Sequence, residues 1–280
     1  AKLNDIITKN PDHAAAHHYL IHVAESKRPE LAEASADALA PLMPNAGHLV
    51  HMPSHIFIRL GRYQDAYDTN VHAVAVDEDY IMQSKAQGIY PLMYYPHNVH
   101  FLSWSSMFTG RSGLAIEAAL KAKSILEMGV RKSSWGSGEN FRVQPIFVMV
   151  RFGKWQELLE MEKPFIKAQY LTGMWHYGRS MAYMNTGNMS AAKEELQKLQ
   201  EIVTKFEEGI PGYSEGGALT NVLNLEIASS LVSGQMASME GEFETAIYHL
   251  GTATRLEDSH VYTEPASWNF PTRHILGAIL

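Results

Sequence analysis

The chain has 280 residues, of which 46% are hydrophobic and 19% charged, and its formal net charge is −7. The acidic balance argues against a nucleic-acid partner, because neutralising phosphates requires an excess of lysine and arginine. Cysteine is absent, which excludes disulfides, thiolate metal sites and a cysteine nucleophile, and no apolar run approaches the roughly 18 residues of a membrane span. We therefore expect a soluble protein without a membrane span, and the composition does not choose between the cytoplasm and the periplasm.

Both ends of the sequence look like interior positions of a longer protein. The opening AKLNDIITKNPDH has neither an initiator methionine nor the regions of a signal peptide, and the last residues, PTRHILGAIL, form an apolar segment. No stretch inside the chain has the composition of a flexible linker. We expect one helical domain over residues 1–280 that is a fragment or a processed form of a longer chain.

A short glycine turn recurs along the chain, each time between two segments with the roughly 3.6-residue apolar period of an amphipathic helix. The turns contain Gly61, Gly110, Gly153, Gly187 and Gly241. A small or apolar residue stands five positions after each glycine, where it allows two helices to approach closely, and glycine can supply the left-handed conformation that ends a helix. The sequence predicts six helix pairs, at 12–26 with 29–42, 46–60 with 63–77, 91–109 with 112–127, 140–152 with 155–168, 170–186 with 189–206, and 218–240 with 243–256, followed by an unpaired helix at 270–280.

This succession of helix pairs resembles the tetratricopeptide repeat, an antiparallel helix pair of about 34 residues that stacks into a right-handed superhelix. The resemblance covers nearly the whole chain and implies an all-α, right-handed α-solenoid of about six repeats. The spacing from Gly153 to Gly187 equals that period, whereas the spacings between the other glycines are longer. We therefore expect irregular repeats.

Histidines are concentrated near the start of the chain, where ten of the fourteen precede residue 101. Six of them form pairs spaced by three or four positions: His18 with His22, His51 with His55, and His97 with His100. Such a spacing places both rings on one helix face, and imidazole is the commonest metal ligand near neutral pH. All three pairs fall on predicted first helices, which line the concave groove in tetratricopeptide folds, so we expect them to converge there. His72 falls on a predicted outer helix and is left out.

Other polar residues are expected beside these pairs. Glu25 follows His22 by three positions, so its carboxylate can act as a ligand or as an acceptor that orients an imidazole. Pro53 and Pro96 precede paired histidines and either start a helix or bend one. Further candidates for the metal site or its surroundings are His17, His48, Tyr94, Tyr95 and Asn98, with His13 beside them and His176 farther along the groove.

A site made of imidazoles with at most one carboxylate suits Zn, Cu, Fe or Ni and disfavours Ca and Mg. Three or four ligands with an open position permit Lewis-acid or redox chemistry on a small-molecule substrate, whereas four protein ligands indicate a structural site. The sequence contains no GxSxG, phosphate-binding GxxxxGK[ST] or HExxH motif that would name a reaction.

The strings HYLIHVAES, GHLVHMPSHIFIRLGRY and YYPHNVHFL are similar to those of a group of bacterial tetratricopeptide-like proteins, with the best match over residues 12–110. This resemblance implies a longer parent with further repeats before Ala1, and it names no activity. Two functions stay open. One is a metal-binding repeat protein, extending to a metalloenzyme; the other is a scaffold that holds a peptide or protein partner in its groove, with structural histidines.

Overall fold

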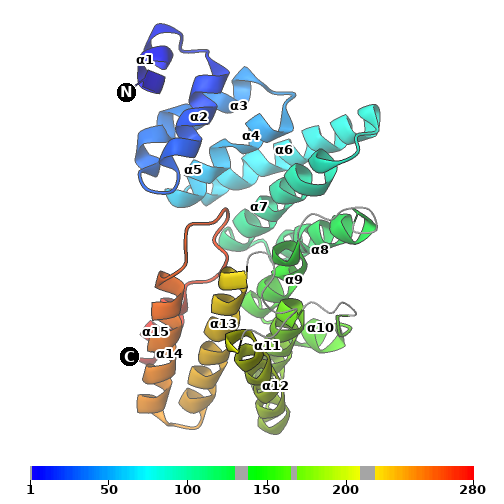
Figure 1. Ribbon diagram of the computed structural model, residues 1–280, viewed down its shortest axis with the longest axis vertical. Helices are drawn as coiled ribbons and strands as arrows, with labels where there is room; N and C mark the ends of the chain where they lie inside the picture. Colours follow the sequence, from blue (N-terminus) through cyan, green and yellow to red (C-terminus); the bar gives the residue numbers. More distant parts are fainter. Residues whose placement is uncertain (1, 130–137, 165–168, 209–217) are drawn as a thin grey trace. The chain divides into compact units, whose positions relative to one another are not determined.

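The structure is a computed structural model that describes residues 2–129, 138–164, 169–208 and 218–280 (Figure 1). Every regular element in these ranges is helical, which confirms the all-α class predicted from the sequence. None of the described helices combines the length and the apolar character that crossing a membrane requires. The chain divides into two compact units, Ala1–Ser133 and Ser134–Leu280.

The first unit contains the helices that carry the histidine pairs. In chain order its described elements are α1 (Lys2–Lys9), α2 (Ala14–Ala24), the 3₁₀ turn η1 (Pro29–Ala32), α3 (Glu33–Leu42), α4 (Gly47–His51), α5 (Pro53–Arg59), α6 (Tyr63–Ser84), the π-helical turn η2 (Tyr90–Tyr94), α7 (Tyr95–Phe108) and α8 (Ser112–Gly129). Helices that follow one another pack together, as α2 with α3, α6 with α7, and α7 with α8. Contacts of α2 with α5 and of α4 with α7 bring the histidine-bearing helices together.

Proline divides the helix predicted over residues 46–60. Pro53 has no N–H group to donate to the preceding turn, and it begins α5, while α4 ends at His51. Met52 between them keeps a helical backbone, so the chain does not become extended between the two helices. Pro96 lies in the first turn of α7. Both prolines therefore start helices, which was one of the two roles predicted for them.

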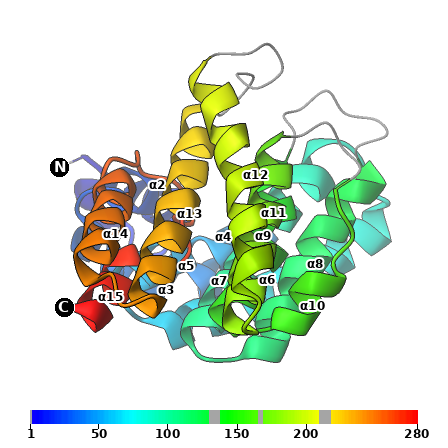
Figure 2. The ribbon, with the colours of Figure 1, turned by 90° about the horizontal axis from the view of Figure 1, so that it is seen from below.

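The second unit contains α9 (Glu139–Arg151), α10 (Trp155–Glu160), α11 (Gln169–Asn185), α12 (Met189–Glu207), α13 (Ala218–Met239), α14 (Phe243–Asp258) and α15 (Thr272–Ile279). Helix α11 packs against α12, and α13 against α14; Figure 2 shows these neighbours along their length. Helix α10 ends at Glu160, before the predicted end at 168, and residues 165–168 lie outside the described part. The last helix, for which no partner was predicted, packs on α14.

The five predicted glycine turns end their helices in the same way. Each glycine has a positive φ between 64° and 85°, which costs glycine little because it has no Cβ. The N–H of the next residue then donates to the carbonyl five positions earlier, as from Arg62 to Phe57 (2.9 Å). The small or apolar residues five positions after the glycines are all buried; they are Ala66, Ala115, Leu158, Ala192 and Ala246.

Candidate metal centre

Six histidines of the first unit form two groups of three. Within each group, one ring nitrogen from every residue lies within 4.8 Å of one ring nitrogen of each of the other two. The inner triad consists of His51 at the end of α4, His55 on α5 and His97 on α7. The outer triad consists of His18 and His22 on α2 and His48 on α4.

The two triads contain five of the six histidines predicted as ligands, and their sixth member is His48 instead of His100. His48, predicted as a secondary candidate, completes the outer triad. His100 lies buried on α7 and belongs to neither triad. The three predicted pairs are therefore redistributed, because α4 contributes His48 to one triad and His51 to the other.

The rings of the inner triad face one another in a buried space. His51 and His55 are 0% and 1% exposed, and their Nε2 atoms are 2.8 Å apart. The His97 ring lies 4.9 Å from the His51 ring and 5.6 Å from the His55 ring, between centroids. Phe101, one turn after His97, contacts all three rings at 4.6 to 4.9 Å and forms an apolar wall. The triad is thus shielded from water on this side.

Hydrogen bonds to the Nδ1 atoms fix which nitrogen of each facing ring carries the proton. Asn70 donates through Nδ2 to the Ala66 carbonyl (2.7 Å), so its Oδ1 faces His51 Nδ1 (2.7 Å) and can only accept. His55 Nδ1 donates to Oε2 of Glu25 (2.5 Å). In the neutral rings both Nε2 atoms therefore carry lone pairs.

Two lone pairs 2.8 Å apart repel each other unless a proton or a metal ion lies between them. Two nitrogens bound to one metal at about 2.1 Å are about 3.0 Å apart at right angles and about 3.4 Å apart in a tetrahedral site, so binding an ion would move the two rings slightly apart. Burial lowers the pKa values of His51 and His97 well below the ordinary value, and the neighbouring imidazoles lower them further. These rings are thus neutral at pH 7, which is the form that binds a metal.

The outer triad is nearer the solvent. Its ring centroids are 4.8 Å apart for His18 and His22, 5.2 Å for His18 and His48, and 6.3 Å for His22 and His48. The His22 side chain is 38% exposed. His18 Nε2 and His48 Nδ1 are buried, and neither has a hydrogen-bond partner among the described residues. Burial, followed by repulsion from His18, lowers the pKa of His48 to about 4, and burial also lowers that of His18.

Glu25 connects the two triads. Glu25 is 3% exposed, and its carboxylate accepts from His22 Nδ1 through Oε1 (3.0 Å) and from His55 Nδ1 through Oε2 (2.5 Å). A carboxylate that accepts from one ring nitrogen directs the other nitrogen toward a metal and increases its basicity. Of the two predicted roles for Glu25, the contacts thus support the acceptor that orients an imidazole.

The other predicted candidates make contacts of different kinds. His17 uses both ring nitrogens, because Nε2 donates to the Pro11 carbonyl (2.7 Å) and Nδ1 accepts from Ser35 (2.9 Å). His13 caps the start of α2, and His72 is exposed on α6. These histidines belong to neither triad.

Two of the three predicted candidates around η2 and α7 lie beside acidic side chains of α6. Tyr94 packs its ring on His48, with centroids 5.2 Å apart. Tyr95 donates to Glu78 (2.7 Å), and Asn98 donates to the buried Asp77 (2.7 Å). Of these three residues, Tyr94 is the one whose ring lies against a triad ring in the described part of the first unit.

Sequence reasoning missed Asn70, whose side chain is fully buried on α6. A signal for it exists in the sequence, because Asn70 lies four positions after Ala66 and three before Ala73 and so falls on the inward face of the helix. A polar residue on that face requires a buried partner. The sequence does not tell which partner, because His51 comes from another helix.

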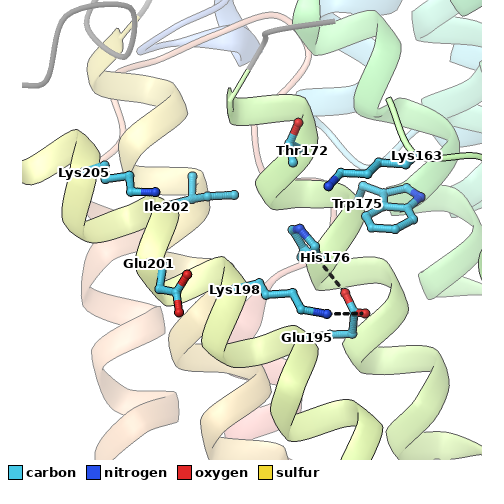
Figure 3. Close-up of a pocket in the computed structure, with 9 residues that line it drawn as sticks. All are labelled: Lys163, Thr172, Trp175, His176, Glu195, Lys198, Glu201, Ile202 and Lys205. Carbon is cyan, nitrogen blue, oxygen red and sulfur yellow. Dashed lines mark hydrogen bonds and ion pairs between the residues drawn. The ribbon is translucent and has the colours of Figure 1, made fainter. Parts of the chain in front are cut away.

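His176 lies in a separate pocket of the second unit (Figure 3). The pocket has a volume of about 340 Å³ and is lined by Lys163, Thr172, Trp175, His176, Glu195, Lys198, Glu201, Ile202 and Lys205. His176 Nδ1 donates to Glu195 (2.5 Å), which also accepts from Lys198 (3.2 Å). The wall of this pocket offers a single imidazole, and His176 is not part of either triad.

Comparison of the chain with protein-family models and with curated proteins found no match.

Proposed function

We propose that this chain binds a transition-metal ion at the inner triad, with His51, His55 and His97 as ligands. The observation that carries the proposal is the pair of Nε2 atoms 2.8 Å apart, each left with a lone pair by the partner of its Nδ1. A metal ion removes this repulsion because it accepts both lone pairs at once.

His17 shows how the same scaffold accommodates a structural histidine. One of its nitrogens donates to a carbonyl and the other accepts from a hydroxyl, so both are satisfied without a cation. His51 and His55 have the opposite arrangement, with acceptors beside their Nδ1 atoms and with their Nε2 atoms directed at one another. This contrast favours metal binding over a purely structural role for His51 and His55.

The ligand set supports Zn, Cu, Fe or Ni, since three imidazoles suit these ions. Three protein ligands leave a position open for water or a small-molecule substrate, as in catalytic zinc sites. A bound ion would supply Lewis-acid or redox chemistry at that position. The proposal thus extends to a metalloenzyme whose substrate and reaction are undefined.

For the scaffold we propose a right-handed solenoid of the tetratricopeptide type with about six repeats. Support comes from the five turns that share a positive-φ glycine and the same backbone closure. A groove for peptides, the alternative function of such a scaffold, would present polar groups to solvent. His51 and His55 are too deeply buried to reach a peptide, so the inner triad does not support that alternative.

The test is metal analysis of protein purified without a nickel column, followed by titration of the metal-free protein with Zn²⁺ and Co²⁺. We expect at least about one equivalent of metal. His97→Gln should weaken binding at least about tenfold. His72→Gln is the matched control, because His72 is exposed and outside both triads.

The proposal is overturned if the protein holds less than about 0.2 equivalents and binds no metal on titration. It is also overturned if His97→Gln and His72→Gln bind with the affinity of the unaltered chain. Circular dichroism of each variant checks that its helices are retained.

A further inference from the structure

We infer that the chain binds a second transition-metal ion at the outer triad and that Glu25 couples the two sites. This inference rests on the proposed function, because it takes the inner triad as the first site. It assigns His18, His22 and His48 as ligands of a separate ion, and it assigns Glu25 the positioning of one ligand in each site.

The first support for an ion at the outer triad comes from a buried nitrogen of His18 and one of His48 that have no hydrogen-bond partner among the described residues. Burying a polar atom without a partner destabilises the fold, and folded proteins rarely contain such an atom without a compensating ligand, ion or water. Here two such atoms lie in one group with His22, and the candidate ligand nitrogens of all three rings lie within 4.8 Å of one another. One ion at the centre of the group satisfies both.

The second support comes from the hydrogen bond between His22 and Glu25. Because His22 Nδ1 donates to the carboxylate, its Nε2 keeps a lone pair that is available to a metal. The same carboxylate fixes the same tautomer of His55 in the inner triad. One buried side chain therefore prepares a ligand for each site.

The two sites are close enough for bound ions to interact. Between the triads, the ring centroids of His22 and His55 are 6.0 Å apart, and those of His48 and His51 are 6.4 Å apart. Two divalent ions at this range repel each other strongly where the surroundings are buried. The negative charge of Glu25, in contact with both triads, offsets part of this repulsion and so favours double occupancy.

The exposure of the rings sets the expected order of filling. The inner triad is buried and its two facing rings are held by Asn70 and Glu25, so it should bind first and release its ion slowly. The outer triad includes the exposed ring of His22, which gives an ion direct access from solvent. We therefore expect the outer ion to be the weaker and the more readily exchanged.

The experiment is a titration of the full, metal-free chain with Zn²⁺, Co²⁺ and Cu²⁺, with stoichiometry from metal analysis and calorimetry. The unaltered chain should bind about two ions, and His48→Gln about one. His22→Gln, at an exposed position, should also lose one of the two ions, and it replaces His48→Gln in the experiment if that variant does not fold. His72→Gln should keep both ions.

Glu25→Gln tests the coupling. A glutamine amide can accept from only one of the two rings, and its NH₂ group forces the other ring to move its proton to Nε2, where a metal would bind. We expect affinity to fall about 10- to 100-fold at the site whose ring faces the NH₂ group. Glu117→Gln, at an exposed position of α8, is the matched control and should change neither affinity.

Electron paramagnetic resonance of the Cu²⁺-loaded chain tests whether the two bound ions lie close together. Two neighbouring Cu²⁺ ions should broaden each other's signal, and His48→Gln should restore an isolated-ion spectrum. If the chain binds one ion that is lost in His97→Gln and unaffected in His48→Gln and His22→Gln, this inference is wrong and the proposed function stands. If no ion binds, both are wrong.

Discussion

Asn70 provides a sharp test of how the inner triad is held. Its Oδ1 accepts from His51 Nδ1 (2.7 Å), and its Nδ2 donates to the Ala66 carbonyl (2.7 Å). Asn70→Ala removes the acceptor and leaves His51 Nδ1 with the Ser54 hydroxyl at 3.3 Å. We expect a loss of about 1 to 3 kcal/mol in the free energy of unfolding, which is the cost of a poorly paired buried donor.

The same substitution should weaken metal binding, because the His51 ring loses the group that fixes its tautomer and orientation. Loss of such a partner typically lowers metal affinity about 10- to 100-fold, or about 1.4 to 2.8 kcal/mol. Asn70→Asp keeps an acceptor for His51 and should retain affinity within about threefold. It should still lose stability, because it buries a charge beside the Ala66 carbonyl.

Urea unfolding of the metal-free variants measures the first effect, and Zn²⁺ titration of the folded variants measures the second. The two substitutions separate the roles, since both destabilise the fold but only Asn70→Ala should weaken metal binding. If Asn70→Ala binds Zn²⁺ as tightly as the unaltered chain, the tautomer of His51 is not set by Asn70 and the reasoning fails.

Three further predictions concern the same unit. Gly47→Ala should lower the free energy of unfolding, measured in urea, by about 1 to 3 kcal/mol, because the added Cβ would lie 1.8 Å from Asp77 Oδ1. The control is Gly113→Ala, also in a helix, whose added Cβ meets no atom within 4 Å. This control should raise the free energy of unfolding by about 0.4 to 1 kcal/mol. Similar effects of the two substitutions would contradict this packing. The metal-free chain should lose stability as the pH falls from about 6.5 to 4, because the fold lowers the pKa of His48 to about 4 and the unfolded chain takes up the proton first. For His48 the expected loss in the free energy of unfolding between these pH values is about 3 kcal/mol. An unchanged free energy of unfolding between pH 6.5 and 4 would contradict this prediction. His17→Gln should destabilise the fold by about 1 to 3 kcal/mol without changing Zn²⁺ affinity, and reduced affinity would place His17 at a metal site.

Much of the helical arrangement could be predicted because its signals are local. A glycine such as Gly61 ends a helix through its own φ and the bond from the next residue, so neighbouring residues contain the information. The histidine pairs follow the same logic, since residues three or four apart share a face in any helix. The break at Pro53 was also visible as a helix start or bend.

The membership of the two triads could not be predicted, because it depends on contacts between helices distant in the sequence. His48 and His51 share the short helix α4, yet they join rings from α2 on one side and from α5 and α7 on the other. The partnership of His51 with Asn70 spans 19 positions and that of His55 with Glu25 spans 30. The spacing of residues within one helix does not indicate which residue of another helix each of them contacts.

Anomalous diffraction from crystals of the Zn²⁺-loaded chain tests the central claim most directly. We predict a peak beside the Nε2 atoms of His51 and His55, with these nitrogens and one from His97 at about 2.0 to 2.2 Å. A loaded crystal in which the zinc lies elsewhere, with the inner triad lacking a peak, would contradict the account.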